Sequence, residues 1–350
     1  MQKIKWKRQI FPLEVSIIIT DKCNFNCMHC CVVDRGINKD LNIETVKNII
    51  DEMEANRVYN LNITGGEPFL YQNGRIMEVL RYAERKKMRI HLNTNFTVLD
   101  KAIIKELAKL RVSHIDISIH GFSEKILKRF CRTNKNNFEK LKKNIRLGIE
   151  YELPFIFTTT ITKINYQDIL IFLKYIGKQK IKTFFSAGLF HPTGQGLINY
   201  NKLFIKDKNL NRIYSKILDI AEVNKIECLI QKRNNASEIK ESAKEIEKSI
   251  ITHNFGCPCG EYSCFIWPDG RVTHCPYGFD DIFVMGNVYK NSLKEIWNSK
   301  TGLEWKHKRK KLIKTDCKYY DICFGGCPCD TYHLTGDIYS CDPYCAFLNK

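Results

Sequence analysis

Three cysteines stand in one short segment, TDKCNFNCMHC, directly after an apolar, strand-like run at 15–20. Cys23, Cys27 and Cys30 follow the spacing C-x3-C-x2-C, and three thiolates in such a loop can hold three irons of a cubane [4Fe–4S] cluster. A purely structural metal site uses four ligands, so a set of three thiolates leaves the fourth iron open for a small molecule. The spacing therefore predicts a reactive cluster at the end of a strand, with half of a zinc site as the alternative.

A second motif, TGGEP at 64–68, follows another apolar run at 59–63. Gly65 and Gly66 permit a close approach of the backbone to a ligand, and the Glu67 carboxylate can accept a hydrogen bond from an ammonium group. Together the two motifs resemble the radical S-adenosylmethionine (radical SAM) superfamily. The resemblance implies that the amine and carboxylate of SAM chelate the open iron, and that an electron cleaves the sulfonium to a 5′-deoxyadenosyl radical.

Strand-like and helix-like stretches alternate from residue 12 to residue 187, which favours a parallel α/β sheet. The expected strands lie at 14–20, 59–64, 89–93, 114–119, 154–161 and 182–187. The expected helices lie at 43–56, 74–87, 101–110, 137–149 and 167–178. These units match the partial (β/α)6 TIM-like barrel of the superfamily, in which ligands sit at the carboxyl ends of the strands.

Polar residues at further strand ends are candidate SAM contacts by the same resemblance. Asn95 follows the third expected strand and Ser118 ends the fourth, where relatives place groups near the ribose and carboxylate of SAM. His29 occupies a position usually taken by an aromatic residue near adenine, and it is not expected to ligate iron. Arg132 lies where related enzymes often carry a basic residue. An ordinary strand-end turn is the alternative for Asn95 and Ser118, and a surface role is the alternative for Arg132.

The C-terminal part of the chain holds a second concentration of cysteines, too dense to be core filling. They are Cys257, Cys259, Cys264, Cys275, Cys317, Cys323, Cys327, Cys329, Cys341 and Cys345. The tripeptide PDG at 268–270 is a turn signal between two strand-like runs, so a hairpin would bring Cys257 or Cys259 near Cys275. The whole pattern resembles the SPASM domain, a small cysteine-rich domain that holds two auxiliary [4Fe–4S] clusters, and a zinc ribbon is the alternative.

The resemblance to the SPASM domain implies ligands for one or two auxiliary clusters. The first cluster would use Cys257, Cys275, Cys327 and one of Cys259 and Cys264. For the second cluster, Lys314 stands where the family pattern has its first cysteine. The remaining ligands of the second cluster would be Cys317, Cys323 and Cys345. Either Cys341 or Cys329 completes this set, or the cluster keeps an open iron that binds a substrate thiolate.

Length and composition agree with one large catalytic unit and an appendage. With 350 residues, 44% of them hydrophobic, the chain can bury a substantial core. We expect a radical SAM barrel at 12–197, a helical bridge at 198–252 and a SPASM domain at 253–350. The apolar runs are far shorter than the roughly 20 residues of a membrane span, and the basic N-terminus lacks the apolar stretch of a signal peptide. Sixteen cysteines without such a signal indicate metal binding in a reducing, anaerobic cytoplasm.

The net charge of +18 has two interpretations, a solvated surface or the attraction of an acidic substrate or peptide. Nucleic acid is not an expected partner, because the basic runs at 140–146 and 306–311 lack interleaved aromatic residues. A membrane is not an expected partner either. We expect an electron donor such as flavodoxin or ferredoxin.

The predicted activity is that of a radical SAM oxidoreductase acting on a ribosomally made peptide or a protein side chain, because relatives with a SPASM domain most often act on these. The product would carry an oxidative cross-link such as a thioether, or an inverted stereocentre. Few residues precede the first strand, so we expect a separate leader-binding protein, or the barrel, to recognise any leader. The alternative enzyme is a small-molecule oxidase or epimerase for a sugar, an aminocyclitol or a cofactor precursor. The non-catalytic alternative is an iron–sulfur electron carrier.

Overall fold

The computed structural model describes residues 9–32, 35–133, 136–231, 260–303, 326–340 and 342–345. The chain groups into two compact units. One of them, the barrel unit, holds residues 18–40 and 62–233. The other, the cysteine-rich unit, holds residues 1–17, 41–61 and 234–350.

The strands of the barrel unit lie side by side in the order in which they follow along the chain. They are β2 (Asn60–Thr64, in this unit from Asn62), β3 (Arg89–Thr94), β4 (Val112–Ser118), β5 (Phe155–Thr160), β6 (Phe184–Gly188) and β7 (Glu227–Ile230). Every neighbouring pair from β3 to β7 is parallel. This arrangement confirms the expected α/β class with the parallel sheet of a partial barrel.

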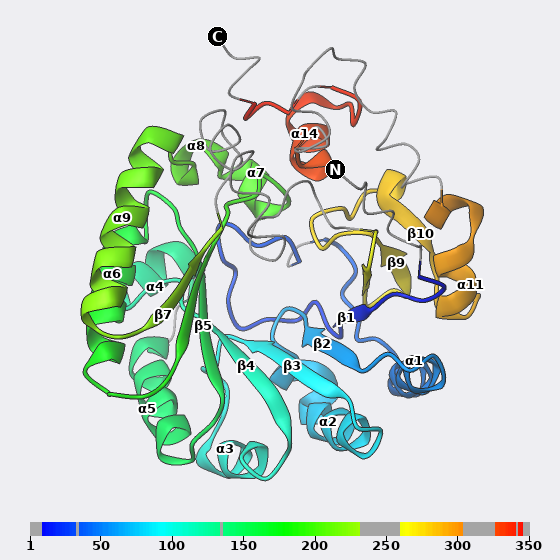
Figure 1. Ribbon diagram of the computed structural model, residues 1–350, viewed down its shortest axis with the longest axis horizontal. Helices are drawn as coiled ribbons and strands as arrows, with labels where there is room; N and C mark the ends of the chain where they lie inside the picture. Colours follow the sequence, from blue (N-terminus) through cyan, green and yellow to red (C-terminus); the bar gives the residue numbers. More distant parts are fainter. Residues whose placement is uncertain are drawn as a thin grey trace, which may run out of the picture. The chain divides into compact units, whose positions relative to one another are not determined.

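Helices follow the strands and lie along the outer face of the sheet (Figure 1). They are α2 (Ile76–Arg85), α3 (Lys101–Leu107), α4 (Glu124–Cys131), α5 (Asn137–Glu150), α6 (Tyr166–Gly177) and α9 (Asp207–Val223). The short α7 (Gln195–Ile198) and α8 (Tyr200–Leu203) follow β6 beyond the end of the strands (Figure 1). Side chains fix where several begin. Asp100 accepts a hydrogen bond from Ile103 N at the start of α3, and Ser123 accepts one from Ile126 N at the start of α4.

The two faces of the parallel sheet differ in polarity because side chains along a strand alternate. Phe157 of β5 and Phe185 of β6 are fully buried and contact Phe172 of α6, so this face carries the core. The opposite, inner face carries half-buried polar residues, among them the register partners Ser118 and Thr158. A polar inner face gives the barrel unit a surface that can bind a ligand.

The cysteine-rich unit contains a smaller sheet with the strand order β10-β9-β8-β1. Its strands are β1 (Glu14–Ile18, in this unit up to Ile17), β8 (Ser263–Ile266), β9 (Arg271–Thr273) and β10 (Val284–Asn287). β8 is parallel to β1 and antiparallel to β9, and β9 is antiparallel to β10. The turn at 268–270 joins β8 to β9 with Gly270 at φ +83°, so the expected hairpin is present.

Helices of the cysteine-rich unit include α1 (Ile43–Ala55), α11 (Leu293–Asn298) and α14 (Pro328–Thr335). Ser292 and Glu295 form a reciprocal cap at the start of α11. The Glu52 carboxylate of α1 accepts hydrogen bonds from the backbone of Leu293 and Lys294. A negative charge there complements the exposed amides of a helix N-terminus, so α1 fixes the start of α11.

All six expected strands overlap β1 to β6, and the expected helices overlap α1, α2, α3, α5 and α6. In the barrel unit α4, β7 and the short α7 and α8 were not expected, and in the cysteine-rich unit β10, α11 and α14 were not. The described part of the segment expected to be a helical bridge contains α9 and also β7, which pairs with β6. The other expected bridge helix, at 236–250, lies outside the described residues. The three domain boundaries remain a prediction.

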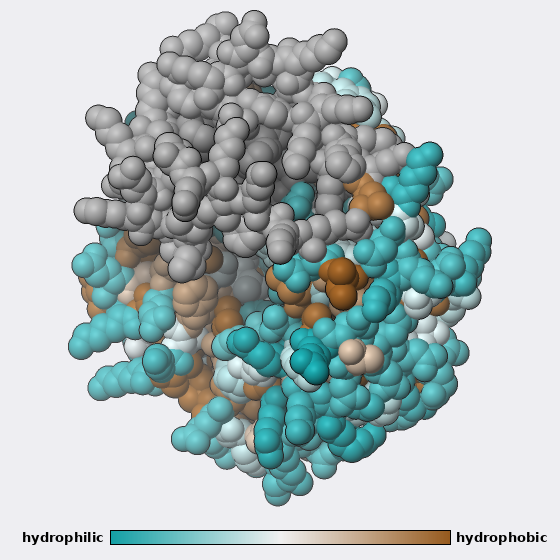
Figure 2. Space-filling model, turned by 45° about the vertical axis from the view of Figure 1, so that its right-hand side comes forward, coloured by the Kyte–Doolittle hydropathy of each residue, from teal (hydrophilic) through white to brown (hydrophobic). Residues whose placement is uncertain are grey.

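The surface drawn in Figure 2 is mostly hydrophilic over the described residues, with apolar groups scattered among charged ones. This agrees with the high content of charged residues in the sequence. Within the described ranges, none of the helices is both long enough and apolar enough to cross a membrane.

Candidate iron–sulfur and SAM site

The three cysteines of the C-x3-C-x2-C motif lie in an irregular loop after β1, here the cluster loop (residues 21–32). Cys27 belongs to a buried apolar cluster against which Cys23 and Cys30 pack, so the loop brings the three cysteines together. The backbone amide of Phe25 donates to Cys23 Sγ at 3.4 Å, and that of Val32 donates to Cys30 Sγ at 3.4 Å. Amides that point at sulfur favour the thiolate form, which is the form that binds iron.

Without a metal the thiols of the cluster loop resist ionisation. Burial, followed by the charge of Cys27, raises the pKa of Cys23 well above its usual value. A hydrogen bond with Cys131, followed by burial, raises the pKa of Cys27, and the nearby Arg132 cation opposes this rise. A bound cation reverses such shifts, because it stabilises the negative sulfur directly. Three soft sulfur donors, two of which accept hydrogen bonds from backbone amides, fit a [4Fe–4S] cluster held by three thiolates.

The TGGEP segment pairs with the start of the cluster loop through a hydrogen-bond ladder. Ile19 N donates to Thr64 O at 2.9 Å, Gly66 N to Thr20 O at 2.7 Å, and Glu67 N to Lys22 O at 2.7 Å. These bonds continue past the ends of β1 and β2. The two motifs recognised in the sequence therefore form one backbone assembly.

The glycines of this ladder are explained by a backbone contact. A Cβ on Gly65 would lie 2.7 Å from Thr20 O, and a Cβ on Gly66 would lie 2.2 Å from Lys22 O. Both distances are impossible for a real side chain, and the obstacle is backbone that cannot swing away. The sequence suggested that the glycines let the backbone approach a ligand. The structure shows that they let it approach the cluster loop.

The Glu67 carboxylate is completely buried and bonded to protein donors. One oxygen accepts from Thr94 Oγ1 at 2.8 Å and Phe69 N at 3.2 Å, and the other accepts from Asn95 N at 2.8 Å. Burial raises the pKa of Glu67 to about 7, although these hydrogen bonds favour the ionised form. In this arrangement Glu67 fixes the end of β3. Its predicted contact with the SAM amine would need the remaining lone pairs of the carboxylate.

Asn95 belongs to a side-chain network beside Cys23. Its Nδ2 donates to Asn24 Oδ1 at 2.7 Å and lies 3.9 Å from Cys23 Sγ. Its Oδ1 accepts from Thr97 N at 3.0 Å and from the Thr97 hydroxyl, which also accepts from Asn24 Nδ2 at 2.8 Å. Asn24 and Thr97 were not among the predicted site residues. They position Asn95 and the first cysteine together.

Two imidazoles and a phenyl ring pack behind the cluster loop. The His29 ring is stacked on Phe130 with centroids 5.0 Å apart, and it meets His120 edge to face at 4.3 Å. Burial lowers the pKa of His29, as does His120, and burial lowers the pKa of His120 to about 4, so both rings are neutral. Both Nδ1 atoms are enclosed and have no hydrogen-bond partner among the described residues. Ser118 ends β4 two residues before His120, and its predicted SAM contact remains a prediction.

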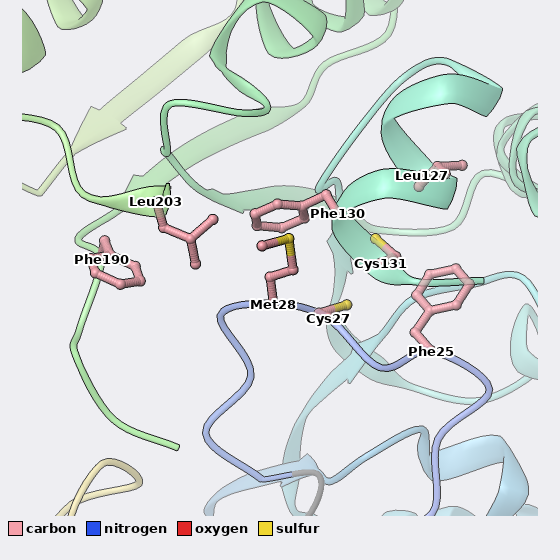
Figure 3. Packing of buried hydrophobic residues seen from close by; sticks show 8 residues of the cluster. All are labelled: Phe25, Cys27, Met28, Leu127, Phe130, Cys131, Phe190 and Leu203. Atoms are coloured by element: carbon pink, nitrogen blue, oxygen red, sulfur yellow. The ribbon is translucent and has the colours of Figure 1, made fainter. Parts of the chain in front are cut away.

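The end of α4 and the segment 194–199 hold the cluster loop from the other side. Asn26 N donates to Cys131 O and Met28 N to Phe130 O, both at 2.9 Å. Figure 3 shows the apolar cluster around these bonds, in which the loop residues face α4 and the segments bearing Phe190 and Leu203. Arg132, at φ +52°, donates hydrogen bonds to the side chains of Gln195 and Asn199 in the segment 194–199. A role for Arg132 as a structural link was not anticipated.

Deeper on the inner face lies the carboxylate of Asp116 on β4. Its register partner is Asn93, which donates to Asn62 Oδ1 at 2.5 Å. Below them, His91 and His114 are register partners with ring centroids 5.0 Å apart. Burial raises the pKa of Asp116 to about 6. The inner face of the strands therefore offers carboxylate, amide and imidazole groups to a bound molecule.

The cysteine-rich unit brings three of its cysteines into one apolar cluster. Cys275 and Cys329 are buried there with Phe283, and Cys327 packs against them. Tyr277 N donates to Cys275 Sγ at 3.5 Å, in the manner of the amides in the cluster loop.

The Cys264 thiol of β8 has different surroundings. It is fully buried, and its pKa is raised by burial and by the nearby Glu14 carboxylate. Cys345 is partly buried, and its N–H donates to Asp342 O at 2.9 Å. The other predicted auxiliary ligands lie outside the described residues: Cys257, Cys259, Cys317, Cys323 and Cys341.

Comparison with known proteins identifies the class. The radical SAM superfamily model matches residues 17–176, and the model of the SPASM iron–sulfur cluster-binding domain matches residues 257–330. The chain belongs to the radical SAM superfamily and carries a C-terminal SPASM domain. It is therefore an oxidoreductase whose cofactors are SAM, the [4Fe–4S] cluster that binds it, and one or two auxiliary [4Fe–4S] clusters.

Several characterised relatives match nearly the whole chain. An AdoMet-dependent heme synthase of Methanosarcina barkeri is 27% identical over 96% of this chain and 97% of its own length. The PqqA peptide cyclase of Bradyrhizobium diazoefficiens is 24% identical over 96% of this chain and 86% of its own length. The crystal structure of Streptococcus suis SuiB superposes with a TM-score of 0.75 at 20% identity, over 96% of this chain and 77% of SuiB. The structural match supports the fold.

The contact at Gly66 generates a prediction about stability. Gly66→Ala should lower the free energy of unfolding by about 1–3 kcal/mol, because the new methyl group would overlap the Lys22 carbonyl and force the ladder apart. Gly188→Ala is the matched control, since a Cβ there would lie 3.5 Å from Thr159 O, an ordinary contact. Thermal unfolding of both purified variants measures the difference. Equal midpoints would show that the ladder is not rigid.

Asp116 generates a prediction about pH. Because its pKa in the folded chain is about 6, above the usual value for Asp, the folded state holds the proton more tightly, and stability contributed by this group is lost as the pH rises through 6. Asp116→Asn cannot ionise, so its stability relative to wild type should increase between about pH 4 and about pH 6 and level off above that range. Urea unfolding at several pH values measures this difference, and a constant difference would contradict the raised pKa.

Proposed function

We propose that Cys23, Cys27 and Cys30 hold the SAM-binding cluster, and that the enzyme abstracts a hydrogen atom from a peptide or protein side chain. The arrangement of the cluster loop carries the proposal, since it gathers three cysteines and directs backbone amides at two of them. When bound, the cluster supplies the electron that cleaves SAM, and the 5′-deoxyadenosyl radical takes the hydrogen atom. The outcome is an oxidative cross-link such as a thioether, or an epimerisation.

The chain's own residues orient the cluster loop, bind SAM and exclude water from the site. The ladder to Gly66 and Glu67 and the bonds to Phe130 and Cys131 fix the loop on two sides. The buried Asn95 network holds its first cysteine in place. The neutral His29 and His120 rings and Phe130 form an aromatic wall behind the loop, which suits an uncharged heterocycle such as adenine.

A peptide substrate is supported by one relative, the PqqA peptide cyclase, whose name gives a peptide as its substrate. On the inner face of the strands, the half-buried polar side chains of Asp116, Ser118 and Thr158 can offer hydrogen bonds to a substrate. We propose in addition an electron donor of the flavodoxin or ferredoxin type and a separate protein that recognises a leader peptide.

A cofactor precursor is the second candidate substrate. The heme synthase of Methanosarcina barkeri matches over 96% of this chain and 97% of its own length. The net charge of +18 would attract an acidic small molecule as well as an acidic peptide. This candidate differs from the first in the substrate alone.

For the first auxiliary cluster we propose Cys257, Cys259, Cys275 and Cys327, and exclude Cys264. The cluster of apolar residues that contains Cys275 and Cys327 supports the first part. The position of Cys264 within β8, outside that apolar cluster, supports the exclusion.

Formation of 5′-deoxyadenosine tests the proposed chemistry. The anaerobically reconstituted, dithionite-reduced enzyme should form it from SAM, and the triple variant Cys23→Ala/Cys27→Ala/Cys30→Ala should not, because no cluster can then bind SAM. The same assay with added Fe-coproporphyrin III, or with a cysteine-containing precursor peptide, separates the two substrates by which addition raises turnover. An iron-loaded wild type that forms none with any addition would favour an electron carrier.

Iron content tests the auxiliary ligands. Cys275→Ala should lose the iron of about one cluster per chain, whereas Cys264→Ala should retain all of it, because Cys264 is outside the apolar cluster that holds Cys275, Cys327 and Cys329. Iron and sulfide analysis with Mössbauer spectra measures the loss. Equal losses from the two variants would place Cys264 among the ligands.

A further inference from the structure

A further cysteine lies against the cluster loop in the barrel unit. Cys131, the last residue of α4, is completely buried and belongs to the same apolar cluster as Cys27. Figure 3 shows the two sulfur atoms between Phe25 and Phe130. Nothing in the C-x3-C-x2-C motif or in its spacing calls for this residue.

The backbone holds Cys27 beside Cys131. The residues on both sides of Cys27 are bound to the end of α4, since Asn26 N donates to Cys131 O and Met28 N to Phe130 O, each at 2.9 Å. Cys27 can therefore not move away from Cys131 without breaking two buried hydrogen bonds. The following residue, Arg132, is held in turn by Gln195 and Asn199.

Burial excludes other roles for Cys131. With no exposed surface, and with Phe25, Leu127 and Phe130 in the same apolar cluster, its thiol cannot reach a substrate to return a hydrogen atom. Packing alone does not require sulfur, because an alanine or valine would also fill an apolar site. What sulfur adds at this position is an S–H donor facing another sulfur.

We propose that Cys131 is a positioning residue for the SAM-binding cluster: its S–H donates a hydrogen bond to the Cys27 sulfur and raises the reduction potential of the cluster. The inference rests on the proposed function, which assigns Cys27 to that cluster. A thiolate bound to iron has no proton, so it can only accept, and Cys131 must be the donor. A donor to a ligating sulfur withdraws electron density and stabilises the more negative, reduced cluster.

The test compares Cys131→Val, Cys131→Ala and Cys131→Ser in the complete, reconstituted enzyme. The midpoint potential of the loop cluster is followed by electron paramagnetic resonance, using the signal that the triple variant Cys23→Ala/Cys27→Ala/Cys30→Ala lacks. Cys228→Ala in β7 is the control for removing a thiol elsewhere. Iron content and the thermal unfolding midpoint of every variant show whether the fold and the clusters are retained.

The variants without a donor, Val and Ala, should shift the midpoint potential to lower values at unchanged iron content. Cys131→Ser keeps a hydroxyl donor and should remain at or above the wild-type potential, and Cys228→Ala should equal wild type. A wild-type potential in Cys131→Val, or an equal decrease in Val and Ser, overturns the proposal.

Should neither variant without a donor retain the loop cluster, Cys131→Ser decides alone, and a potential below wild type overturns the proposal. If the triple variant still shows every signal, the loop does not hold a cluster. The proposed function would then fail, and the role of the hydrogen bond would not be what the result contradicts.

Discussion

The hydrogen-bond ladder between the cluster loop and the TGGEP segment is the constraint on which the site depends. Gly66 N to Thr20 O and Glu67 N to Lys22 O, both 2.7 Å, extend the pairing of two strands beyond the sheet. The Glu67 carboxylate then binds the end of β3. This short ladder thus fixes the start of an irregular loop to the ordered sheet. A metal site in such a loop needs its ligands held in fixed directions.

The sequence revealed the site by composition and spacing, and the structure added how it is held. Cysteines, paired glycines and strand-like runs are local patterns, and the elements from β1 to β6 follow from them. The link from Asn95 to Asn24 and that from Cys131 to Cys27 join residues distant in sequence, so no local pattern contains them. β7 was missed because four residues that alternate between exposed and half-buried give little signal.

The barrel unit also separates two kinds of polar environment. Around His29 and His120 the walls are apolar, and both imidazoles are neutral. On the inner face, Asp116 and Asn93 sit in a row of half-buried polar groups. A reactive carbon radical survives where few hydrogen donors and little water surround it, whereas a substrate needs polar groups to orient it. The apolar strand ends suit the radical, and the polar inner face suits the orientation of a substrate.

The contact of Gln195 N with Cys30 O has a consequence for the order in which the chain acquires its structure. Its two residues are separated by most of the barrel unit, and loop closure over such a distance is slow compared with local folding. During synthesis the cluster loop emerges early, but its bond to Gln195 cannot form until most of the barrel unit has been made. The cluster loop is thus among the first segments made, yet one of the contacts that hold it can form only late.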